Sequence, residues 1–151
     1  MTRVLVPRER RAGENRVAAT PETVKRLIGR GCELWVECAA GEAAGFADAA
    51  YSEAGARLFA DHEAALAWRG ADVVLSVQGA ALGEHQGPLG AAALELLPAG
   101  ALLIGLLEPH GNAALQALLQ RQTLSAMALE LLPRISRAQA MDVLSSQANV
   151  A

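Results

Sequence analysis

The side chains best suited to chemistry lie near the end of the chain. Ser136 is followed three residues later by Gln139, which fits a capping box at the start of a helix. On a helical period, one face of that helix is polar and carries a single charge; it consists of Gln139, Asp142, Ser145, Ser146 and Asn149. A solvated helix face usually contains Lys, Glu or Arg. This face is better suited to hydrogen-bond an amide or hydroxyl ligand, or another protein surface.

The opposite face of the same predicted helix is apolar and consists of Met141, Leu144, Ala148 and Ala151. No stop signal precedes Ala151, so we expect the chain to be cut inside this helix.

Other common chemical motifs are absent from the sequence. It has no G-x-G-x-x-G, no Walker A motif and no cluster of metal ligands. Cys32 and Cys38 lie far in sequence from the histidines, and a zinc site needs about four ligands. We therefore predict no metal site and two free thiols, buried or half-buried, in a reducing cytoplasm.

Composition and charge limit the functional classes. The chain has 151 residues, enough for one domain with a core, and a formal charge of −3, which gives no electrostatic case for binding nucleic acid or acidic membranes. The longest apolar stretch, residues 98–107, is far shorter than the roughly 20 residues that span a bilayer. No signal peptide is visible. We expect a soluble domain without direct membrane insertion.

Short apolar runs recur along the chain and predict five strands. They cover residues 3–6, 33–36, 72–77, 101–107 and 123–128. The third and fourth runs are nearly continuous in Val, Leu and Ile, which predicts burial on both faces, as in a parallel sheet.

Helical patterns lie between these runs. Thr20 is a candidate cap and Pro21 suits the first helical position of one helix. Asp61 is expected to cap a second helix, and a third is expected over residues 113–120. The second helix is expected to bury Ala64, Ala65 and Trp68. The order predicts a single α/β domain over residues 1–151, with a mainly parallel sheet of about five strands and helices on both faces, Rossmann- or flavodoxin-like.

Residues 133–149, PRISRAQAMDVLSSQAN, closely resemble the signature of transhydrogenase alpha subunits. In that family a loop with Arg, Gln and Asp at this spacing lies beside the nicotinamide of NAD(H). The resemblance implies that Arg134 and Ser145 help to place the carboxamide. It also implies that Gln139 and Asp142 face a neighbouring NADP(H)-binding component. The alternative is that Gln139 only completes the capping box and that Asp142 pairs with Arg134 or Arg137.

The N-terminal residues also resemble a wider family that includes alanine dehydrogenases. The matching segments are residues 6–9, VPRE, and 14–21, ENRVAATP. In the dehydrogenases the residue matching Arg16 binds the substrate carboxylate, as a bidentate guanidinium can. The alternative is a salt bridge of Arg16 with Glu9 or Glu14. Residues 40–46, AGEAAGF, resemble both families too, and their glycines are interpreted as turn and cap positions.

Two positions depart from the family pattern. Ser76 stands where alanine dehydrogenases have a substrate-binding lysine, which transhydrogenases usually keep. Glu108 follows the fourth strand, where the dehydrogenases carry a catalytic histidine. A glutamate there can act as a general acid or base if it is buried; the simpler interpretation is a loop carboxylate. Amino-acid dehydrogenation is therefore disfavoured.

By resemblance, the chain is the N-terminal portion of the NAD(H)-binding alpha subunit of a proton-translocating NAD(P) transhydrogenase. The expected partners are a second copy, the NADP(H)-binding component and the membrane component, which place it at the cytoplasmic side of the inner membrane. A Rossmann domain that holds the NAD pyrophosphate is expected to follow. The alternatives are an alanine dehydrogenase-like enzyme or a truncated non-catalytic fragment, and we expect the isolated chain to bind NAD weakly and to be inactive alone.

Overall fold

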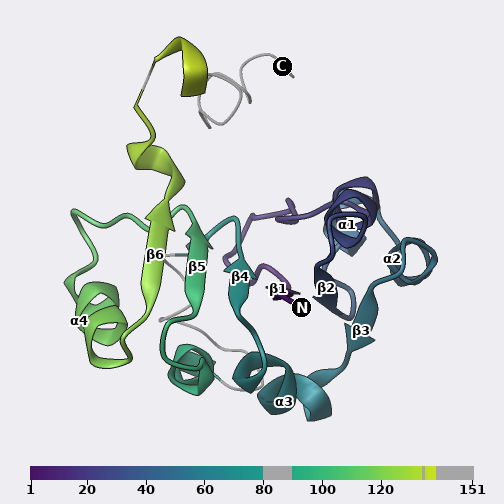
Figure 1. Ribbon diagram of the computed structural model, residues 1–151, viewed down its shortest axis with the longest axis horizontal. Helices are drawn as coiled ribbons and strands as arrows, with labels where there is room; N and C mark the ends of the chain where they lie inside the picture. The colour runs from purple at the N-terminus through teal and green to yellow at the C-terminus, as the bar shows by residue number, and fades with distance from the viewer. Residues whose placement is uncertain (80–89, 134, 139–151) are drawn as a thin grey trace.

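The computed structural model describes residues 1–79, 90–133 and 135–138. Within these ranges, six parallel strands form one sheet in the order β3-β2-β1-β4-β5-β6 (Figure 1). The strands are β1 (Arg3–Val6), β2 (Glu33–Glu37), β3 (Arg57–Phe59), β4 (Val73–Leu75), β5 (Leu102–Gly105) and β6 (Ser125–Ala128). All neighbouring pairs are parallel, which confirms the predicted fold class.

Helices connect the strands in the alternating order that the sequence predicts. The α-helices are α1 (Pro21–Ile28), α2 (Asp48–Glu53), α3 (Ala64–Arg69) and α4 (Ala113–Arg121). The described residues also form short 3-10 helices: η1 (Glu42–Ala44), η2 (Asp61–Glu63), η4 (Gly90–Leu96), η5 (Leu129–Leu131) and η6 (Ser136–Ala138). The predicted long helix from Ser136 to Ala151 lies, beyond Ala138, outside the described residues.

The sheet has one strand more than the five that were predicted. The additional strand is β3, which pairs with β2 at one edge of the sheet. It has only three residues, Arg57, Leu58 and Phe59, and only Phe59 is fully buried. A run this short carries too little apolar periodicity to be recognised.

Two apolar clusters cover the two faces of the sheet. On one face, α3, η4 and α4 pack on side chains that include Leu5, Val74 and Leu103. On the other, α1 and α2 pack on β1 and β2 through side chains that include Val24 and Tyr51. Figure 1 shows α1 and α2 gathered at the β2–β3 end of the sheet. The expectation of helices on both faces is therefore confirmed.

The prediction that β4 and β5 are buried on both faces is wrong for one face. Val74 and Leu103 are completely buried, but their neighbours Leu75, Leu102 and Ile104 are partly exposed. Exposure thus alternates along each strand, because only one face of this half of the sheet is packed under helices of the described chain.

The start of α1 agrees with its prediction and the start of α3 does not. The Thr23 amide donates to the Thr20 hydroxyl at 3.3 Å, and Pro21 opens the helix. Asp61 is not a cap. It lies inside η2, where the Glu63 carboxylate accepts a hydrogen bond from the Ala60 amide at 3.4 Å. The buried residues of α3 are Ala64, Ala67 and Trp68, so Ala65 was predicted wrongly.

A close backbone approach explains one glycine of the family-like segment at residues 40–46. A β-carbon on Gly41 would lie 2.6 Å from Cε2 of Tyr51 and 2.9 Å from the β-carbon of Phe46. The buried Tyr51 ring is fixed there because its hydroxyl donates to the Ala19 carbonyl at 3.0 Å. Gly41 and Gly45 occupy the caps of η1, and Gly45 has a φ of +84°, as the turn-and-cap interpretation requires.

We predict that Gly41→Ala lowers the free energy of unfolding by about 1–3 kcal/mol, because the added methyl group overpacks against the Tyr51 ring. Gly29→Ala is the matched control: its added carbon meets only backbone oxygens at 3.4 and 3.5 Å, at an ordinary helical φ of −60°. The control should leave stability unchanged or raise it by about 0.4–1 kcal/mol. Urea unfolding of both variants decides; equal effects would show that the contact with Tyr51 is not limiting.

Candidate functional site

The strand order places a crevice between β1 and β4. In an open parallel sheet, ligands bind outside the carboxyl ends of the strands at the point where the strand order reverses. Here β1 leads toward β2 and β3 on one side, while β4, β5 and β6 follow on the other. The residues after β1 and those after β4 therefore form the first place to look for a site.

Glu9 joins the two sides of this crevice. Its carboxylate accepts hydrogen bonds from the Val77 amide at 2.6 Å, the Gln78 amide at 3.0 Å and the Ser76 hydroxyl at 3.0 Å. Charge-assisted bonds of this kind are stronger than neutral ones. Glu9 is thus committed to the segment after β4, and of the two ion-pair partners proposed for Arg16 it is not the one observed.

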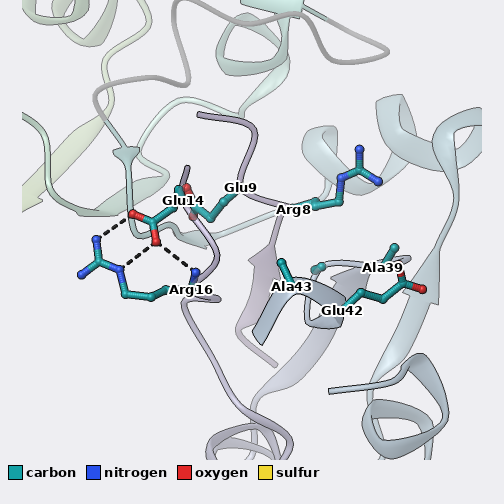
Figure 2. A pocket seen from close by; sticks show the side chains of 8 residues that line it. Arg8, Glu9, Glu14, Arg16, Ala39, Glu42 and Ala43 are labelled. Atoms are coloured by element: carbon teal, nitrogen blue, oxygen red, sulfur yellow. Dashed lines mark hydrogen bonds and ion pairs between the residues drawn. The ribbon is translucent and has the colours of Figure 1, made fainter. Parts of the chain in front are cut away.

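Glu14 is the partner of Arg16. The Arg16 side chain donates from Nε to one Glu14 oxygen at 2.7 Å and from a terminal nitrogen to the other at 2.6 Å (Figure 2). The Arg16 amide and the Gln78 side chain donate to the same carboxylate at 2.9 and 2.8 Å. The salt-bridge alternative for Arg16 is therefore realised, and its role in contacting an anion or substrate stays a prediction.

These contacts set the ionisation of the pair. The Glu14 side chain is only 7% exposed, which by itself favours the neutral acid. The hydrogen bonds from Arg16 outweigh burial and lower the pKa of Glu14 from 4.5 to about 2. The same pair raises the pKa of Arg16. Near neutral pH the charge of Arg16 is thus largely compensated by its own neighbour.

A half-open pocket of about 450 Å³ adjoins this pair. It is lined by Arg8, Glu9, Glu14, Arg16, Ala39, Ala40, Glu42 and Ala43. Figure 2 shows Arg8 and Arg16 directed to opposite sides of the pocket, so the two guanidinium groups do not form one clamp.

The two positions that depart from the family pattern differ in their surroundings. Ser76 is buried, and its hydroxyl is held by Glu9. Glu108 is 57% exposed and forms an ion pair with Arg11 at 3.1 Å. Because Glu108 is exposed, the condition for a buried general acid or base is not met, and the loop-carboxylate interpretation is confirmed.

Glu130 binds the segment after β5 in the way that Glu9 binds the segment after β4. Its carboxylate accepts from the Leu107 amide at 2.8 Å and from the Glu108 amide at 2.5 Å. These bonds hold Glu108 at a φ of +48°, which a non-glycine residue rarely adopts. Glu9, Gln78 and Glu130 were not recognised from the sequence as organising residues. The only signal was a polar residue directly after a buried strand.

The four predicted nicotinamide contacts, Arg134, Gln139, Asp142 and Ser145, lie outside the described residues. The segments that lead toward them, η5 and η6, follow the carboxyl end of β6 (Figure 1). Because all strands are parallel, that end lies at the same edge of the sheet as the crevice between β1 and β4.

Some functional classes find no support in the described residues. These contain no group of three or more His, Cys, Asp or Glu side chains placed to hold a metal ion. Within the same ranges, no helix has the length and hydrophobicity needed to cross a bilayer. Cys32 and Cys38 are free and half-buried, as predicted.

Comparison with known proteins shows the family. Residues 5–151 match the family described as "Alanine dehydrogenase/PNT, N-terminal domain". The chain belongs to this family. One relative in it is the first of the separate chains that make up "NAD(P) transhydrogenase subunit alpha" in Rhodospirillum rubrum. It is 43% identical over 149 residues, which are 99% of this chain and 37% of the relative.

Solved structures of the same family have the same fold. The transhydrogenase of Sinorhizobium meliloti superposes with a TM-score of 0.80 and 36% identity, over 98% of this chain and 39% of that one. An L-alanine dehydrogenase superposes with a TM-score of 0.74 and 30% identity, over 92% of this chain and 36% of that one. The chain thus spans less than half the length of these family members.

We predict that Glu14→Gln lowers the free energy of unfolding by about 1–2 kcal/mol at pH 7, because the amide keeps the shape but loses the charge that Arg16 binds. Since the folded pKa is depressed to about 2, this stabilisation is present above pH 4.5 and is lost as the pH falls toward 2. Denaturant unfolding of wild type and variant across this range measures the difference.

Glu22→Gln is the control for this experiment. It removes a carboxylate from an ion pair with Arg26 in which both side chains are about three-quarters exposed, 74% and 76%. It should change stability by less than about 0.5 kcal/mol. A difference between Glu14→Gln and wild type that persists unchanged at pH 2 would contradict the assigned ionisation.

Proposed function

We propose that this chain is the N-terminal portion of the NAD(H)-binding component of a proton-translocating NAD(P) transhydrogenase. The observation that carries the proposal is the 43% identity to a transhydrogenase alpha subunit over 99% of the chain. In this role the domain helps to position a nicotinamide ring for hydride transfer between NAD(H) and NADP(H). Residues 1–151 then form one domain, followed in the subunit by a Rossmann domain.

The carboxyl edge of the sheet fits only one end of NAD(H). Pyrophosphate is usually bound by free backbone amides at the edge of a Rossmann sheet. Here the amides of Val77 and Gln78 are taken by Glu9, and those of Leu107 and Glu108 by Glu130. A second anion is therefore disfavoured at this edge, which supports a pyrophosphate site elsewhere in the subunit. The nicotinamide end carries an uncharged carboxamide and meets no such obstacle.

The residues proposed to act on the nicotinamide are the four in the C-terminal segment. Arg134 and Ser145 hydrogen-bond the carboxamide, while Gln139 and Asp142 face the NADP(H)-binding component. When bound, NAD(H) supplies or accepts the hydride, and this transfer needs no general base. The protein's contribution is to hold the rings close, in the right orientation and away from water.

The partners follow from the subunit proposal. They are a second copy of the subunit, an NADP(H)-binding component and a membrane-spanning component. The domain itself is then cytoplasmic and peripheral on the inner membrane through these partners. Support comes from the relative's name, which describes one portion of one subunit.

An alanine dehydrogenase-like activity is the second candidate, supported by the similarity to an L-alanine dehydrogenase. It requires a cationic site for the substrate carboxylate and a group that moves a proton. Arg16 is bound by Glu14, Ser76 offers a hydroxyl instead of an ammonium group, and Glu108 is exposed. The transhydrogenase proposal needs none of these groups and is preferred.

We predict that the 151-residue chain binds NADH weakly or undetectably in a calorimetric titration. A chimera in which it replaces the matching residues of the Rhodospirillum rubrum subunit should bind NADH and, with the remaining subunits of that enzyme, transfer hydride to an NADP analogue. Tight binding by the chain alone would contradict a pyrophosphate site elsewhere. NADH oxidation that depends on pyruvate and ammonia would favour the dehydrogenase. A folded chimera without turnover would favour a non-catalytic fragment.

Within the chimera, Arg134→Ala and Asp142→Asn should each lower the rate of hydride transfer by about 10- to 100-fold, because misplacement of a ring by about 1 Å has an effect of this size. The control is Arg137→Ala, an exposed neighbour without an assigned contact. If it lowers the rate as much as Asp142→Asn, the ion-pair alternative for Asp142 is favoured over the nicotinamide role.

A further inference from the structure

One face of β5 and β6 has no cover within the described residues. The side chains on it, Leu102 and Ile104 of β5 and Met127 of β6, belong to neither apolar cluster. Leu102 and Ile104 are partly exposed, and Met127 is 49% exposed. The register places Leu75, Ile104 and Met127 next to one another in a row across three strands. We call this surface the open face.

The open face is unusual for a parallel sheet. Sheets of this kind occur almost only with both faces covered. The reverse side of the same strands obeys the rule, since Val74 and Leu103 are completely buried there. On the side of the open face, α1 and α2 cover β1 and β2 and reach only the border residues Val73 and Leu75. The uncovered area is thus confined to the half of the sheet formed by β5 and β6 (Figure 1).

The chemistry of the open face selects an apolar partner. Its row contains Leu, Ile and Met, and Ser125 is the single polar side chain of β6. The edge strand β6 carries neither charge nor proline, the devices that usually protect an exposed edge. A helix with one apolar stripe is the element that normally covers such a surface in an α/β fold.

We propose that the open face is the docking surface for an amphipathic helix from the region of the same subunit that lies beyond residue 151. The length of the relatives supports this occupant, because the chain spans only 37% of the Rhodospirillum rubrum subunit. The cover on the other half of this face, α1 and α2, also comes from the same chain. A segment of the same subunit has a high effective concentration at the surface, which favours it over a separate protein. The inference rests on the proposed membership in a longer subunit and not on hydride transfer.

The test measures how fast a thiol reagent reaches the open face. Met127→Cys is introduced into a background with Cys32→Ala and Cys38→Ala, because those two thiols are half-buried. Labelling is compared between the 151-residue chain and the chimera with the Rhodospirillum rubrum subunit. We expect rapid labelling in the chain and labelling at least about tenfold slower in the chimera.

Two controls bracket this result. Leu66→Cys lies on α3, where Leu66 is 58% exposed, and should react equally fast in both proteins. Val74→Cys lies in the buried core and should react only if the protein unfolds. Ser125→Cys, in the row beside Met127, repeats the measurement if the first variant is unstable.

Equal labelling of Met127→Cys in the chain and the chimera would overturn the proposal. Slow labelling in the 151-residue chain would also overturn it: protection that rises with protein concentration would identify a second copy as the cover, and concentration-independent protection would identify residues 139–151. A chimera that protects the thiol but transfers no hydride would retain this inference and contradict the proposed function. The reverse result would do the opposite.

Discussion

The arrangement at the carboxyl edge depends on one carboxylate, that of Glu9. It extends from the segment after β1 to the segment after β4 and accepts three hydrogen bonds there. Two parallel strands that separate a sheet into halves leave backbone amides unpaired where they end. Glu9 satisfies those amides from within the chain. It thereby fixes Gln78, which in turn donates to Glu14 and positions the pair of Glu14 and Arg16.

The same solution recurs along the edge and determines what the domain can bind. Glu37 accepts from the Arg8 amide at 2.8 Å and pairs with Arg10, while Glu130 holds the segment after β5. Each carboxylate fills a position that an anionic ligand would otherwise take. The family's switch-point geometry is thus retained, while its capacity for phosphate is used internally. This supports a domain that contributes one wall of a nicotinamide site and leaves the pyrophosphate to another domain.

Much of the fold was predictable from the sequence, and most of the contacts at the edge were not. Apolar runs and caps such as Thr20 are local signals, and they placed five strands and the start of α1. β3 is too short to carry such a signal. The choice of Glu14 over Glu9 as the partner of Arg16 depends on which loops meet at the sheet edge, separated by more than 60 residues. The exposure of Ile104 depends on which face lacks a helix, which a continuous apolar run does not reveal.

The central claim is that Glu9 holds the two halves of the carboxyl edge together. Amide hydrogen exchange at Val77 and Gln78 tests it most directly, in the wild-type chain and in Glu9→Ala, with Glu42→Ala as a control from the exposed side of the same pocket. The account predicts slow exchange in wild type and in the control, and exchange faster by about tenfold or more at both amides in Glu9→Ala. Unchanged exchange in a folded Glu9→Ala variant would contradict it.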